Sequence, residues 1–115
     1  KETLQMDIID KLYSKIECQL TSILKIKDFV LFEKRVDENV FGSRYSVWVN
    51  KQRKEAIRLV WDGKDSWFVL EESPYLNDNR PNSWADIVIV PFNEKNASEE
   101  MDLILSQLIN ELKIE

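Results

Sequence analysis

The sequence contains no histidine and a single cysteine, Cys18, and these two shortages remove most of the familiar catalytic machinery. Ser-His-Asp and Cys-His nucleophiles need an imidazole base, and zinc sites are built from histidines or several cysteines. Cys18 stands beside the acidic Glu17, which does not stabilise a thiolate. We therefore expect Cys18 to be a half-buried structural residue, and we expect neither a metal site nor nucleophilic catalysis.

Glycine is also scarce, with two in the chain, and neither phosphate-binding pattern, GxGxxG or GxxxxGK[ST], occurs. No apolar run approaches the roughly 18 residues that a membrane-spanning helix needs. The first residues, Lys1 to Leu4, are helix-like and do not begin a secretion signal. The sequence thus predicts a cytoplasmic protein that binds no cofactor and no membrane.

Positive charge is in the minority, because 16 basic residues face 21 acidic ones and the net charge is −5. This balance disfavours nucleic-acid binding, which depends on neutralising phosphates. A small basic cluster does lie near Trp48, and an alternative is that it binds nucleic acid or phosphate. Its members are Lys51, Arg53, Lys54 and Arg58. We interpret the cluster as a solvated turn, in which Arg58 can make a cation–π contact with Trp48.

The chain has 43% hydrophobic and 32% charged residues, as folded globular proteins do, and its 115 residues predict a single domain spanning 1–115. Apolar positions recur at steps of three and four from Leu4 to Leu24, which predicts a long first helix. A last helix is expected to begin near Asn96, because Asn96 and Glu99 have the spacing of a capping box.

Between the two helices the hydrophobic period changes to two, which is typical of strands. Five segments fit this pattern: Phe29–Val36, Tyr45–Val49, Ala56–Trp61, Trp67–Glu71 and Asp86–Phe92. Their short connections favour an antiparallel meander over parallel crossovers. The predicted fold is therefore α+β: a two-layer sandwich in which an antiparallel meander sheet of four to five strands packs N-terminal and C-terminal helices on one face.

A four-residue loop at 62–65 provides a working register for the two faces of this sheet. It places five apolar residues toward the helices: Ile57, Leu59, Trp61, Phe68 and Leu70. The same alternation adds Tyr45, Val47 and Val49 to them. The opposite face then carries Trp48, Arg58, Val60, Trp67 and Val69. In the last strand Ile87 and Ile89 point one way and Val88 and Val90 the other, so both of its faces are apolar.

This second face is more apolar than a solvated face should be, so something is expected to cover it. One alternative is the long loop 72–85, folding back with Tyr75, Leu76 and Trp84. The other is a protein partner or a second copy of the chain, because exposed apolar patches mark interaction sites and tryptophan, tyrosine and arginine dominate their binding energy.

These observations favour a small, acidic, non-catalytic protein-binding module of adaptor, chaperone-like or inhibitor/immunity type, which acts through the tryptophan-bearing face. A homodimer is included in this hypothesis. One alternative is a carboxylate-based enzyme with a site under the 72–85 loop, where the residues to consider are Glu71, Tyr75, Arg80 and Asp86. Another is a structural subunit of a larger assembly.

Overall fold

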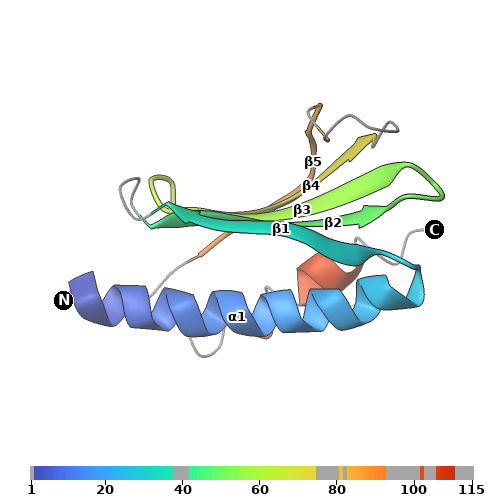
Figure 1. Cartoon of the computed structure of the whole chain (residues 1–115). Coiled ribbons are helices and arrows are strands. Elements are labelled where there is room, and N and C mark those ends of the chain that lie inside the picture. The colour runs from blue at the N-terminus through green and yellow to red at the C-terminus, as the bar shows by residue number, and fades with distance from the viewer. Residues whose placement is uncertain are drawn as a thin grey trace.

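The chain folds as one long helix packed on a five-stranded sheet, as a computed structural model shows (Figure 1). The structure describes residues 2–37, 42–74, 81, 83–92, 102 and 106–110, with side chains from residue 8 onward. Its elements are α1 (Glu2–Ile26), β1 (Val30–Asp37), β2 (Ser43–Asn50), β3 (Glu55–Asp62), β4 (Trp67–Pro74) and β5 (Ala85–Pro91).

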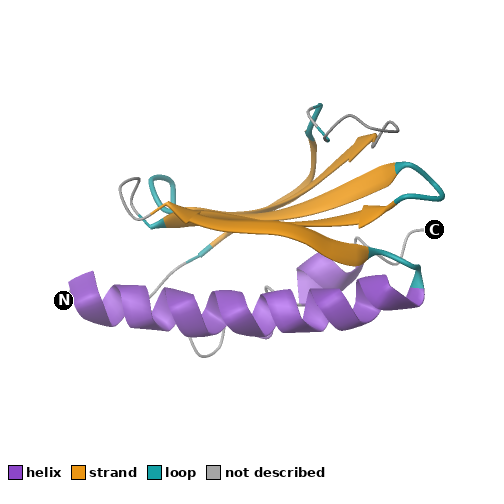
Figure 2. Cartoon of the chain, viewed as in Figure 1, coloured by secondary structure: helices purple, strands orange, loops and turns teal. Residues whose placement is uncertain are grey.

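The strands are antiparallel and lie in the order β1-β2-β3-β4-β5, so the predicted meander is confirmed. Helix α1 runs along one face of the sheet, and residues 106–110 form helical structure on that same side (Figure 2). Leu108 of this segment is fully buried in the core with α1 and the sheet. The predicted α+β arrangement of helix on sheet is thereby confirmed, whereas the predicted capping box at Asn96 and Glu99 lies outside the described residues.

The apolar stripe of α1 supplies one half of the core. Its buried members are Ile9, Leu12, Tyr13, Ile16, Leu20 and Leu24. Cys18 falls on the other side of the helix and is exposed, so the expectation that it is half-buried is wrong. The reason is angular: two residues along a helix rotate the side chain by about 200°, which carries it away from the neighbouring Ile16.

Helix α1 ends in a Schellman motif. Asp28 adopts a left-handed φ of 68°, and the N–H of Phe29 donates to the carbonyl of Leu24 at 3.0 Å. The N–H of Asp28 donates to the carbonyl of Lys25 at 3.0 Å, which satisfies a second helix-end carbonyl. Phe29 and Leu24 are both buried in the core, so this turn directs the chain from α1 straight into β1.

Two hairpins are closed by turns of the same length and the same chemistry. In the first, Asn50 Oδ1 accepts from the N–H of Arg53, and Lys54 takes a φ of 57°. In the second, Asp62 Oδ1 accepts from the N–H groups of two turn residues, and Ser66 takes a φ of 57°. An Asx side chain therefore organises each four-residue turn, and a left-handed residue closes it.

The length of the first of these turns decides the face of Trp48, and the prediction for this residue is wrong. Counting the link as 50–54 places Trp48 on the face away from the helices, but Asn50 belongs to β2 and pairs with Glu55. Trp48 therefore pairs with Ile57 and is fully buried against α1. Because strands alternate with period two, this one-residue difference exchanges the faces of the whole strand. Tyr45, Val47 and Val49 accordingly lie on the other face, again contrary to expectation.

The second turn places β3 and β4 with the predicted faces, although the pairing is shifted by two residues. Trp61 pairs with Phe68 rather than with Ser66, because the loop is 63–66. A shift of two preserves the alternation, so the five residues expected to face the helices all lie in the core. Trp61, Phe68 and Phe92 form an aromatic cluster there, with ring centroids 4.8–6.3 Å apart.

Candidate protein-binding surface

The face of the sheet away from α1, called the open face below, is partly covered by the segment that leads into β5. Val47, Val49 and Ala56 are buried there, and Tyr45 and Trp84 pack against them. Trp84 is thus one of the expected covering residues, whereas Tyr75 lies outside the described residues. The cover extends over the end of the open face where β2 turns into β3.

Arg58 links this cover to the sheet. Its guanidinium lies 4.2 Å from the centre of the Trp84 ring, and its Nε donates to Glu71 Oε1 at 2.5 Å. The ring of Tyr45 lies on the guanidinium as well, at 5.8 Å. The predicted contact between Arg58 and Trp48 is not formed, because Trp48 lies on the opposite face. The stacking surfaces of Arg58 are therefore used inside the molecule.

The remaining predicted binding residues lie beside this cluster on the open face. Val60 pairs with Val69, which pairs with Ile89 of β5, and Trp67 is next on the same face. Val69 is buried, Val60 and Trp67 are partly buried, and Ile89 is 41% exposed. The four residues Arg58, Val60, Trp67 and Val69 are thus brought together as expected, and their role in binding stays a prediction.

Strand β5 departs from the simple alternation at Ile87. Leu70 of β4 pairs with Val88 and Glu71 pairs with Asp86, so Ile87 is the extra residue of a β-bulge. Ile87 and Val88 both pack against the main core, and the expectation that Ile87 points the same way as Ile89 is wrong. The bulge redirects this side chain, as bulges commonly do.

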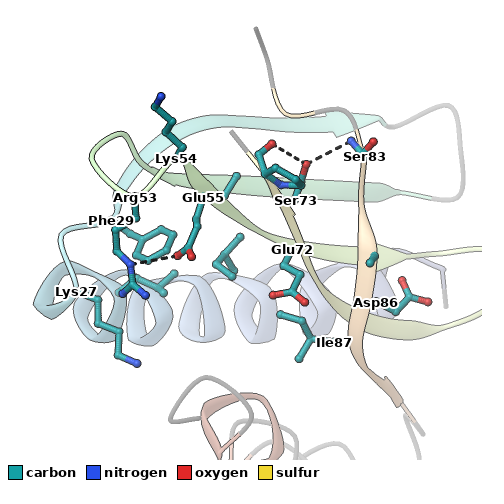
Figure 3. A pocket seen from close by; sticks show the side chains of 15 residues that line it. Lys27, Phe29, Arg53, Lys54, Glu55, Glu72, Ser73, Ser83, Asp86 and Ile87 are labelled. Atoms are coloured by element: carbon teal, nitrogen blue, oxygen red, sulfur yellow. Dashed lines mark hydrogen bonds and ion pairs between the residues drawn. The ribbon is translucent and has the colours of Figure 1, made fainter. Parts of the chain in front are cut away.

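A cavity of about 960 Å³ opens where the C-terminal end of α1, the 51–54 turn and the ends of β4 and β5 meet (Figure 3). Its lining carries charges of both signs, from Lys27, Arg53 and Lys54 and from Glu55, Glu72 and Asp86. Arg53 pairs with Glu55 at 3.7 Å across its rim.

Of the residues expected to form a carboxylate active site, Glu71 and Asp86 are described, and they are not brought together in this cavity. Asp86 lines it, but Glu71 points to the open face and pairs there with Arg58. Tyr75 and Arg80 lie outside the described residues. Within the described part of the chain, no three acidic or cysteine side chains are grouped closely enough to hold a metal ion.

The most exposed apolar surface lies elsewhere, along strand β1 at the edge of the sheet. Seven large apolar side chains are exposed among the described residues, and five of them fall between Ile26 and Val36. Four belong to β1, with exposures of 39–58%, and we call them the edge surface: Val30, Leu31, Phe32 and Val36. The fifth, Ile26, is exposed where α1 ends.

The edge surface presents apolar side chains on both sides of the strand. Val30 pairs with Val49 and lies on the open face, while Leu31 pairs with Trp48 and lies on the helix face. Phe32 is the extra residue of a second β-bulge, between Leu31 and Glu33. Among the described residues, β1 is the outermost strand on this side of the sheet.

Charged residues follow the bulge in β1, and the structure fixes their positions. The Lys34 ammonium lies 3.0 Å from Glu17 Oε1 on the helix face. On the open face the hydroxyl of Tyr45 donates to Glu33 Oε2 at 2.8 Å, and this hydrogen bond raises the pKa of Tyr45. The centre of the edge is therefore polar and ordered, with apolar residues at each end.

Periodicity did not reveal this surface, although a signal for it is present. Four consecutive apolar residues, Phe29 to Phe32, fall in the first strand of the predicted meander. The first strand of a meander has one neighbour, so it must be an edge, and apolar side chains there lack half of the usual cover. The exposed apolar surface is therefore indicated by the place of this strand at the edge of the sheet, and not by its hydrophobic period.

Comparison of the chain with protein-family models, with curated proteins and with solved structures finds no match. Among the described residues, no helix is both long enough and apolar enough to cross a membrane. Functional inference for this protein therefore depends on its own geometry.

Proposed function

We propose that this protein is a non-catalytic protein-binding module whose docking site is the edge surface of β1. The observation that carries the proposal is the concentration of exposed apolar side chains on this one strand and the adjacent end of α1. Exposed apolar residues scattered singly are ordinary, but their concentration on one edge strand favours an interaction site there.

The arrangement of these residues favours a partner that adds a strand to the sheet. An added strand places its side chains alternately on the two faces, as β1 itself does. Val30 on the open face and Leu31 on the helix face would both be covered by such a partner. A partner that docks only on the open face would leave Leu31 and Val36 exposed.

The charges and the bulge of β1 give this edge its selectivity. Natural edge strands use charged residues and bulges to prevent indiscriminate pairing. Here the segment Glu33–Arg35 carries one acidic and two basic side chains, so only a strand with a complementary charge pattern pairs without placing like charges opposite each other.

The test is co-purification from the native host with tagged variants of the edge. Wild-type protein should recover a bound protein, and Leu31→Lys and Val36→Lys should lose it while keeping the circular dichroism of the wild type. Ile89→Lys is the matched control, because it adds the same charge to an exposed apolar site on the open face. Loss of the partner with Ile89→Lys, and its retention with both edge variants, would instead place the docking site on the open face.

A further inference from the structure

We infer that the strand which pairs with β1 is β1 of a second copy of this chain, joined antiparallel about a two-fold axis at Lys34. This inference rests on the proposed function and adds the identity of the partner and the register. It would join two five-stranded sheets into one continuous sheet with both α1 helices on the same side.

Symmetry limits the possible registers. A two-fold axis perpendicular to the sheet places the open faces of both copies on one side of the joined sheet and both helix faces on the other. Directly opposed residues of the two copies must therefore lie on the same face. Glu33 and Arg35 share the open face, whereas Lys34 lies on the helix face. An axis at Lys34 therefore sets Glu33 of each copy against Arg35 of the other and forms two equivalent ion pairs.

The neighbouring registers place like charges together. An axis at Glu33 would set this carboxylate against its own copy, and an axis at Arg35 would set Glu33 against Asp37. With the axis at Lys34 the two lysines face each other, but each is already neutralised by Glu17 of its own helix at 3.0 Å. Charge complementarity thus selects the register centred on Lys34.

The same register brings apolar surface together on both sides of the central charges. Val36 of one copy comes beside the Leu31–Phe32 bulge of the other, and symmetry repeats this contact. Leu31 and Val36 are 44% and 48% exposed in the single chain and share the helix face. Burial of these side chains supplies the favourable free energy of association, while Glu33 and Arg35 specify the alignment.

Charge reversal tests the ion pairs. Sedimentation equilibrium should show a dimer for the wild type, and Glu33→Arg or Arg35→Glu alone should raise the dissociation constant by about tenfold or more, because each change creates two repulsive pairs. The double variant Glu33→Arg/Arg35→Glu should restore the wild-type value. Lys64→Glu makes the same change in charge as Arg35→Glu, at an exposed site in the 63–66 turn outside β1. This variant should leave the dimer intact.

Cross-linking tests the register, in a Cys18→Ser background that removes the exposed native thiol. Directly opposed strand residues are close enough for a disulfide. Lys34→Cys should therefore form a covalent dimer under mild oxidation, and Lys64→Cys should not. Glu33→Cys should cross-link when mixed with Arg35→Cys, and much less with itself.

A wild-type monomer at all concentrations overturns the inference. So does a dimer in which Lys34→Cys cross-links no faster than Lys64→Cys. A monomer whose Leu31→Lys variant still loses a different host protein would leave the proposed function standing and remove only the second copy. A dimer unaffected by every β1 substitution, with unchanged capture of host proteins, would remove both.

Discussion

The indole N–H of Trp48 donates to Thr21 Oγ1 at 3.0 Å, and Thr21 in turn donates to the carbonyl of Glu17 one helical turn earlier. This pair connects the second half of β2 to the C-terminal third of α1. Nearby, Ser46 of the same strand accepts or donates a hydrogen bond at 2.7 Å with the buried hydroxyl of Tyr13. Polar contacts of this kind fix how the helix lies on the sheet, which apolar packing alone specifies less sharply.

Trp48→Phe should destabilise the fold, because it leaves a void in a fully buried site and removes the only donor that Thr21 Oγ1 accepts from in the described structure. We expect the free energy of unfolding to fall by about 2 kcal/mol, measured by urea titration. Trp67→Phe is the control, since Trp67 is partly exposed on the open face, and should cost less than about 1 kcal/mol. Equal losses of unfolding free energy in the two variants would contradict the different burial of Trp48 and Trp67.

The pair Arg58–Glu71 should be worth more than an ordinary surface ion pair, because both side chains are largely shielded from water and Trp84 stacks on the guanidinium. A double-mutant cycle with alanine at both positions should give a coupling energy of about 1–2 kcal/mol. The matched control is the exposed pair Arg53–Glu55, at 3.7 Å, where the coupling should stay below about 0.5 kcal/mol. Similar coupling energies for the two pairs would contradict the claim that shielding from water strengthens the Arg58–Glu71 pair.

Stability should fall in alkaline solution, and Tyr13 should be a main cause. Burial raises the pKa of Tyr13 above its ordinary value of 10.0, while the hydrogen bond with Ser46 acts in the opposite direction. Below pH 10 the phenol is neutral in both states and its contribution is fully present. Above pH 10 the unfolded chain releases this proton and the folded chain keeps it, so stability falls by up to about 1.4 kcal/mol per pH unit.

The measurement is urea unfolding at several pH values between 9 and 11 for the wild type and Tyr13→Phe. The variant should be less stable by about 1 kcal/mol at neutral pH, because it loses the bond to Ser46. Its decline above pH 10 should be shallower, with Tyr45 contributing the remainder, since the pKa of Tyr45 is raised in the same direction. Parallel curves for both proteins would rule out Tyr13 as the titrating group.

Asp28→Gly should stabilise the protein, because Asp28 holds the left-handed position after α1 that glycine adopts without steric cost. Its carboxylate also stands at the negative end of the helix dipole. We expect a gain of about 1 kcal/mol in the free energy of unfolding. Ser22→Gly, at an exposed position inside the same helix, should instead lose about 0.5 kcal/mol. A loss in both variants would contradict the assigned role of Asp28.

The sequence determined the order and type of the elements to within a few residues. The stripe from Leu4 to Leu24 predicted α1, and the period of two predicted strands whose mostly short links favour a meander. Residues Leu59 and Phe68 were assigned to the helix-facing side correctly even though their register was shifted by two, because a shift of two leaves the faces unchanged.

Only the tertiary structure decided which residues form the surfaces available for binding. The period of two says which side chains of a strand share a face, but the length of the turn says which face that is. Because Asn50 belongs to β2 and not to the turn, Trp48 lies in the core. The bulge at Ile87 changed the face of that one side chain and turned it toward the core. The exposure of β1 depends on having no neighbouring strand among the described residues on one side, a property of the whole sheet that no local pattern encodes.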